Sequence, residues 1–312
     1  MLFKLIAFVG IGVVFMGHSA VAQQLDYERR EGNGYARFSY EWLDTNRKKQ
    51  RLKFALPYDD ILTGSKEFKR FDMNDARTFT VKALRKHTKQ FPDVDVDIRR
   101  RYNTIELQVS GRVSQQRLQQ VVDALTKKKE TAMSAYLSNH FYKYIDDASI
   151  MPDHGKIAQR YVSAMQPIAK AMAGYISPNN KRQTMNYLLS FWQSIPYDTL
   201  TDRYSSNGAG FQTPYGVISD NQGDCDSKSV AFAALVRNIY PSARLFMIYT
   251  DKHAFIGAEI PAKRSDMRLN IDGASIVLME PVGPAVVEVG ILREESKIAL
   301  RGGQYSYQEI PF

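Results

Sequence analysis

One cysteine stands between two acids at the start of a predicted helix, and it is the strongest candidate for chemistry. Cys225 is the only cysteine among the 312 residues and lies in the segment GDCDSKSVAFAALV. The residues that follow are apolar nearly all round, which is typical of a buried central helix with Cys225 in its first turn. The helix dipole favours a thiolate there, whereas Asp224 and Asp226 repel one. We therefore expect a cationic imidazole to activate the thiol; the alternative is a buried cysteine that acts as a small hydrophobe.

His253 is the histidine best placed to supply that imidazole. The segments 243–250 (ARLFMIYT) and 253–260 (HAFIGAEI) are predicted strands joined by the tight turn Asp251-Lys252. Alternation along the second strand puts His253 on the face opposite its aliphatic residues, at the end of a sheet where a helix N-terminus can meet it. The alternative is a histidine with a purely structural role.

Of the acids that follow His253, three are within reach of the sequence pattern and could orient its ring. Asp266 lies in the charged stretch KRSDMR, where we expect it to be exposed. Asp272 precedes Gly273 in a two-residue turn signal, so its carboxylate is expected to serve the turn. Glu280 ends an apolar strand, where an acid needs a polar partner. We therefore predict that Glu280 contacts His253.

A helix-borne cysteine, a strand-borne histidine and an acid after the next strand resemble, in that order, the transglutaminase-like superfamily of thiol enzymes. The segments LLSFWQSIPYD, GDCDSKSVAFAAL, HAFIGAEI and EPVGP are similar to bacterial transglutaminase-like cysteine peptidases, over about residues 187–284. The resemblance implies a papain-like triad, with Cys225 as nucleophile, His253 as base and the acid as orienter. The family's usual acid is Asp, and the matching position here is Glu280.

The resemblance also implies attack of the thiol on an amide carbonyl and an acyl-enzyme, followed by release to water or to an amine. We expect hydrolysis, of a protein, a peptidoglycan peptide or a small amide, and no cofactor or metal. The backbone N–H of Cys225 is one candidate donor to the oxyanion, and a group at Gln193 or Tyr197 is the second.

The predicted fold class is α+β, with a papain/transglutaminase-like core in which the cysteine-bearing helix packs on an antiparallel sheet, preceded by a smaller α+β segment. That smaller segment reads as ββαββα: strands at 37–43, 51–57, 94–98 and 104–109, and helices at 74–90 and from 114. Further helices are predicted at 153–176, kinked at Pro167, and before Pro196, followed by a long loop at 198–223.

The first residues have the pattern of a secretory signal, with a basic start, an apolar run and small residues before a cut after Ala22. The alternative is an uncleaved membrane anchor. We therefore predict a signal peptide at 1–22, a basic N-terminal domain at 23–147 and a transglutaminase-like domain at 148–312, exported to the periplasm or secreted.

Positive charge is concentrated in the first half of the chain. The net charge is +9 overall, and residues 23–147 hold 25 Lys and Arg against 18 Asp and Glu, a net of +7. This half could contact an anionic envelope surface, or it could be a solvated surface without a partner. No nucleic-acid-binding motif is present. A catalytically inactive module that acts as a binding or adaptor protein at the envelope is the alternative to the enzyme.

Overall fold

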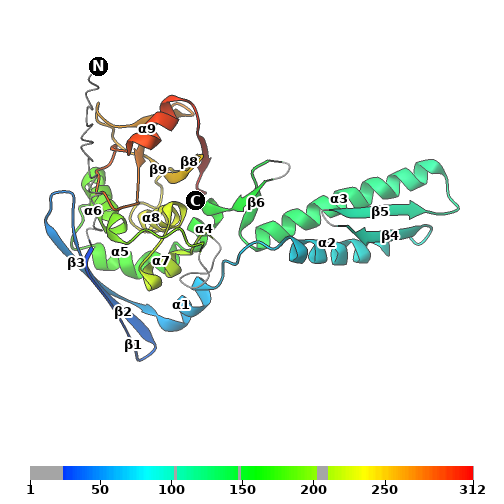
Figure 1. Ribbon diagram of the computed structural model, residues 1–312, viewed down its shortest axis with the longest axis horizontal. Helices are drawn as coiled ribbons and strands as arrows, with labels where there is room; N and C mark the ends of the chain where they lie inside the picture. The colour runs from blue at the N-terminus through cyan, green and yellow to red at the C-terminus, as the bar shows by residue number, and fades with distance from the viewer. Residues whose placement is uncertain (1–23, 102–103, 147–148, 202–209, 312) are drawn as a thin grey trace, which may run out of the picture.

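The computed structural model describes residues 24–101, 104–146, 149–201 and 210–311. It is a mixed helix and strand structure with a curled antiparallel sheet (Figure 1). The predicted signal peptide, 1–22, lies outside the described residues. Among the helices that are described, none combines the length and the apolar character that a membrane crossing requires.

The helix that begins at Cys225 lies at the centre of the larger part of the molecule. This helix, α8 (Cys225–Ile239), is buried continuously from Ser227 to Arg237, as its apolar sequence predicts. It packs against β9 (His253–Glu259) of a five-stranded antiparallel sheet. The strand order is β10-β11-β9-β8-β12, with the other strands at β8 (Leu245–Thr250), β10 (Arg268–Ile271), β11 (Ala274–Met279) and β12 (Ser306–Glu309).

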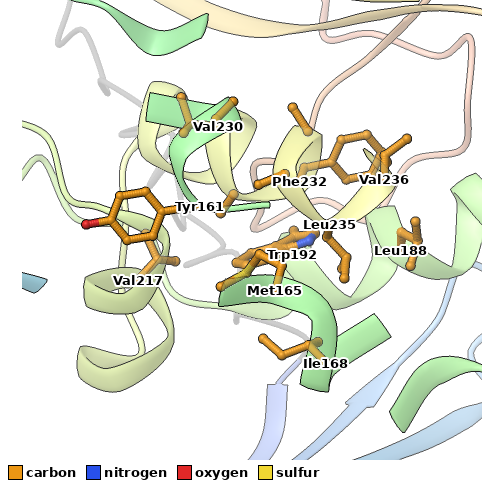
Figure 2. Packing of buried hydrophobic residues seen from close by; sticks show 14 of the residues in the cluster. Tyr161, Met165, Ile168, Leu188, Trp192, Val217, Val230, Phe232, Leu235 and Val236 are labelled. Carbon is orange, nitrogen blue, oxygen red and sulfur yellow. The ribbon is translucent and has the colours of Figure 1, made fainter. Parts of the chain in front are cut away.

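Helices cover the rest of α8. Its side chains Phe232 and Leu235 lie near Trp192 and Met165 in a continuous apolar core (Figure 2). The covering elements are α4 (His154–Arg160), the 3₁₀ helix η1 (Ser163–Met165), α5 (Gln166–Met172), α6 (Lys181–Ser194) and α7 (Pro214–Asp220). The α9 helix (Glu294–Arg301) lies on the other side of the sheet, where Leu300 packs with Phe246 and Phe255.

The first three strands belong to this same core, and the predicted unit 23–147 is wrong in that respect. The strands β1 (Gln24–Gly32), β2 (Tyr35–Leu43) and β3 (Lys49–Pro57) form an antiparallel sheet. From β2, Tyr40 and Trp42 lie edge-on to Phe191 of α6. The alternating apolar face that identified the strands therefore packs on the helices of the second half, a long-range contact that periodicity does not specify.

The remainder of the predicted basic domain forms a separate arm, which extends away from α8 in Figure 1. It consists of α2 (Met73–Thr88), β4 (Asp95–Arg100), β5 (Ile105–Ser110) and α3 (Gln115–Asn139). The arm has its own apolar cluster, in which Leu84 of α2 and Leu125 of α3 are fully buried. Aromatic contacts of Phe71 with Tyr136 and Tyr142 mark its base.

Three connecting regions differ from the predictions. The single helix predicted at 153–176 is divided into α4, η1 and α5, and the division precedes Pro167, which stands at the start of α5. The predicted loop 198–223 contains α7, whose Thr213 cap and Pro214 are a helix-start signal. The short elements α1 (Tyr58–Ser65), β6 (Tyr142–Tyr144) and β7 (Ile150–Pro152) link the arm to the core.

Candidate active site

Cys225 opens α8 at the edge of a cavity of about 510 Å³. Asp224 caps the helix by accepting a hydrogen bond from the backbone N–H of Ser227 at 3.2 Å. The sulfur of Cys225 contacts the backbone N–H of Ala254, the residue after His253. His253, Tyr197 and Arg293 line the same cavity. The cavity is therefore formed where the start of the central helix meets the start of β9, as the strand pattern predicts.

The surroundings of the thiol oppose its ionisation. Burial, followed by the charges of Asp226 and Asp224, raises the pKa of Cys225 to about 12. Contacts with the backbone N–H groups of Ala254 and Asp226 lower the pKa, but by less. The effects that raise the pKa of Cys225 thus exceed those that lower it. This agrees with the expectation from sequence that the helix dipole alone does not activate the thiol.

Glu280 lies beside His253. Its Oε1 atom is 3.6 Å from Nε2 of His253, and the carboxylate is fully buried. Strand register explains the proximity, because Met279 pairs with Ile256 and Leu278 pairs with Gly257 on the neighbouring strand. Glu280 is therefore one strand away from the beginning of β9, on the same face of the sheet as His253. At 3.6 Å the contact is ionic, slightly longer than a hydrogen bond.

Ser296 and Arg293, from the segment around α9, hold the Glu280 carboxylate, and the Arg293 Nε atom lies 3.6 Å from its Oε2. The Ser296 hydroxyl donates to Oε1 at 2.5 Å, and the backbone N–H of Arg293 donates to Oε2 at 3.2 Å. Burial raises the pKa of Glu280, but His253, Ser296 and the backbone N–H of Arg293 together outweigh it and lower the pKa overall. Glu280 is therefore an anion placed to stabilise an imidazolium.

A second histidine contacts Asp226, the residue after Cys225, and is absent from the sequence-based site. His154, at the start of α4, is buried and contacts Asp226 Oδ2 through Nε2 at 3.0 Å and the Tyr249 hydroxyl through Nδ1 at 2.9 Å. Burial lowers the pKa of His154 to about 3, so that its ring is neutral. Burial also raises the pKa of Asp224 and of Asp226. The local sequence signal at this position is Asp153, the acid before His154 that caps a helix. It predicts a helix start and does not predict the contact of His154 with Asp226.

Lys228 adds a buried base one turn into α8. Its ammonium donates to the backbone carbonyl of Ile195, at the end of α6. Burial lowers the pKa of Lys228 to about 7, although the Asp224 charge acts in the opposite direction. The contact joins the start of the cysteine helix to the segment that carries Tyr197.

Gln193 and Tyr197, the two candidates for the second oxyanion donor, differ in their position relative to the cavity. Gln193 is fully buried, and its amide donates to the backbone carbonyls of Glu280 at 2.8 Å and Val287 at 3.1 Å. Gln193 is thus a support for the segment after β11, and the expectation that it could serve as the donor is wrong. Tyr197 lines the cavity beside Cys225, with about half of its surface exposed.

The other two acids lie outside the site. Asp272 and Gly273 both have positive φ, 51° and 79°, as a two-residue hairpin turn requires, and the Asp272 side chain is exposed. Asp266 was expected to be exposed and is buried instead. Its carboxylate pairs with the Arg182 guanidinium and accepts from the backbone N–H of Lys263 at 2.6 Å. Asp266 can be buried because Arg182, a residue distant in the sequence, pairs with its carboxylate. The local charges in KRSDMR do not predict this pairing.

Within the described ranges, no group of three or more His, Cys, Asp or Glu side chains is arranged to hold a metal ion. The site consists of a thiol, an imidazole and a carboxylate, with a tyrosine hydroxyl at the rim. In the comparisons with known proteins, no family model, no curated protein and no solved structure matches this chain.

Proposed function

We propose that the protein is an exported thiol hydrolase that cleaves amide bonds in a protein or peptide substrate, on a papain/transglutaminase-like core. The observation that carries the proposal is the junction of three groups: Cys225 and His253 line one cavity, and the buried Glu280 carboxylate lies 3.6 Å from His253 Nε2. A nucleophile, a base and a group that orients the base are the components of a thiol acyl-transfer site.

In this mechanism, the Nδ1 atom of His253 accepts the proton of the Cys225 thiol, because Nε2 faces Glu280. The thiolate attacks the substrate carbonyl carbon, and the C=O electron pair moves to the oxygen. The backbone N–H of Cys225 and the Tyr197 hydroxyl donate to that oxyanion. The imidazolium then gives its proton to the leaving amine, and the acyl-thioester remains. Water, deprotonated by His253, hydrolyses the thioester and regenerates the thiol.

The raised pKa of the thiol is compatible with this mechanism if the thiolate and the imidazolium form together. Glu280 is a buried anion whose pKa is lowered, and its carboxylate lies 3.6 Å from the ring that carries the positive charge in this ion pair. The imidazolium in turn opposes the repulsion that Asp224 and Asp226 exert on the thiolate. The ion pair replaces the helix dipole as the source of activation.

One observation favours the alternative, a catalytically inactive module that binds a partner at the cell envelope. The pKa of Cys225, at about 12, leaves almost no thiolate at neutral pH unless His253 assists. The two proposals therefore differ in one measurable property, the dependence of thiol reactivity on His253.

The test uses the full chain and three variants: Cys225→Ser, His253→Asn and, as a matched control in the arm, His87→Asn. Alkylation by iodoacetamide at pH 7 is followed by intact mass, and cleavage of a mixed peptide library is followed by mass spectrometry. We expect peptide cleavage by the wild type and by His87→Asn, and a loss of at least about 100-fold in His253→Asn. If no peptide is cleaved and alkylation is equal in wild type and His253→Asn, the protein is the inactive module.

A further inference from the structure

A second cavity, of about 580 Å³, lies in the arm between α2 and β4. The arm extends away from α8, the helix that begins at Cys225 (Figure 1). We call it the arm groove. Its lining residues are Thr78, Val81, Lys82, Arg85, Ile98 and Arg100. Thr78, Lys82 and Arg85 recur at helical spacing and share one face of α2. The floor is apolar and the rim carries three cations.

Strand alternation keeps the acids of β4 away from the arm groove. Ile98 and Arg100 are two residues apart and point to the same face of the strand, the face toward α2. Asp97 and Arg99 point to the opposite face, where their side chains pair at 2.6 Å. The short charged run around β4 is thus divided into a paired outer face and a cationic inner face.

The three rim cations lack carboxylate partners. In the part of the chain that the structure describes, Lys82, Arg85 and Arg100 form no ion pair, whereas Arg101 pairs with Glu106 and Arg117 pairs with Asp93. The guanidinium of Arg100 donates to the Thr78 hydroxyl at 2.7 Å, which holds it at the rim. Three positive charges around one apolar floor therefore face solvent together.

The arm as a whole carries a charge of the same sign. Between residues 73 and 139 there are 13 Lys and Arg against 7 Asp and Glu, a net charge of +6. A surface with this charge is attracted to an anionic bilayer, and each basic residue near the bilayer adds to the attraction. The guanidinium fork matches phosphate geometry, and the floor of Val81 and Ile98 suits the apolar acyl part of a lipid.

We propose that the arm groove binds the phosphate headgroup of an anionic phospholipid, so that the arm places the protein on a membrane surface. The proposal is independent of the thiol chemistry, because none of the groove residues lies in the cavity of Cys225. It assigns a function to the arm, which contributes no residue to the candidate active site.

The test measures co-sedimentation of the full chain with phosphatidylglycerol vesicles and with neutral phosphatidylcholine vesicles. The groove variant is Lys82→Gln/Arg85→Gln/Arg100→Gln. The control, Arg99→Gln/Arg101→Gln/Lys127→Gln, removes the same charge from other exposed positions of the arm. We expect binding to phosphatidylglycerol only, and an affinity at least about tenfold lower in the groove variant than in the control. Lys82→Glu, a single change on the exposed side of α2, should weaken binding in the same direction.

Three results would overturn the proposal. Equal losses in the two triple variants would mean that only the net charge of the arm matters. A groove-dependent rise in melting temperature with inorganic phosphate, without groove-dependent vesicle binding, would assign the groove to a free phosphate compound. Groove-dependent binding of poly-glutamate that exceeds vesicle binding would assign it to an acidic polypeptide. Circular dichroism of each variant establishes that the fold is retained.

Discussion

The Nε2 atom of His154 lies 3.0 Å from Oδ2 of Asp226, and this contact joins α4 to the first turn of the cysteine helix across 72 residues of sequence. The histidine is buried and neutral, and because a carboxylate accepts, the Nε2–H tautomer donates to the Asp226 carboxylate next to Cys225. The orientation of Asp226, which raises the pKa of the thiol, therefore depends on a residue that the cysteine motif does not include.

The depressed pKa of His154 predicts a loss of stability in acid. The pKa is about 3 in the folded protein against an ordinary value of 6.5, so the unfolded chain binds the proton first as the pH falls. Stability is fully present above pH 6.5 and decreases toward pH 3, by at most about 1.4 kcal/mol per pH unit for this group. We expect the free energy of unfolding of His154→Gln to vary less with pH than that of the wild type between pH 4 and 6.5. Urea denaturation at several pH values checks this, and parallel pH curves would contradict it.

Asp226 is expected to slow the reaction of the thiol. Its negative charge raises the pKa of Cys225, so Asp226→Asn should lower that pKa and increase the rate of alkylation at pH 7. A decrease of one unit in the pKa would give about a tenfold increase. The pH–rate profile of iodoacetamide labelling measures both quantities, with Asp123→Asn in the arm as the control. A slower reaction would show that Asp226 acts mainly by stabilising the imidazolium of His253. The charge of His253 lowers the pKa of Asp226, so the two groups interact.

Glu280→Gln should keep the fold and reduce the reactivity of the thiol. The amide oxygen can still accept from the Arg293 N–H, and the amide N–H can donate to the Ser296 hydroxyl, but the charge that stabilises imidazolium is lost. We expect alkylation at pH 7 to be slower by about tenfold, equivalent to one pKa unit of lost stabilisation. Asp272→Asn, at the exposed hairpin turn, should change stability more than reactivity. If Asp272→Asn quenches the thiol and Glu280→Gln does not, the assignment of the orienting acid is wrong.

The parts of the site that could be predicted from sequence depend on local patterns. Alternation identified the strand that begins at His253, a turn dipeptide separated Asp272 from the candidates, and an apolar run placed Cys225 at a helix start. The signal for Glu280 was the apolar strand before it, and its contact with His253 arises because that strand, β11, pairs with β9 although β10 lies between them in the chain. In each case the signal lies within a few residues of the side chain concerned.

The parts that could not be predicted depend on contacts between distant segments. His154 reaches Asp226 from another helix, and Arg182 neutralises Asp266 across 84 residues. The sequence does not show that the Gln193 amide bonds to the backbone carbonyl of Glu280, a partner 87 residues away. The charge that made residues 23–147 resemble one basic domain carries no information about packing, since the apolar faces of β2 and β3 are buried by the helices of the second half.

Because β2 and β3 pack on the helices of the second half, a truncation that removes the whole first half does not isolate the active site. A chain that begins near Met151 would keep every candidate catalytic residue, but it would lose β2 and β3 and expose Phe191. Burial of each large apolar side chain contributes about 1.5–3 kcal/mol, and a whole domain is stable by only about 5–15 kcal/mol. We expect that chain not to fold, as judged by the absence of a cooperative thermal transition.

Removal of the arm alone should leave the thiol intact. The rings of Phe71 and Tyr136, on either side of the arm, lie 6.5 Å apart between centroids, so a short Gly-Ser linker can replace residues 73–135. The arm has its own apolar cluster, and its loss leaves α8 and the five-stranded sheet covered. We expect this chain to melt cooperatively and to alkylate Cys225 at a rate within about twofold of the full chain, because the cavity contains no arm residue. If it melts cooperatively but Cys225 no longer reacts, the arm takes part in the site. If it fails to fold while the chain from Met151 folds, the core around α8 does not depend on β2 and β3.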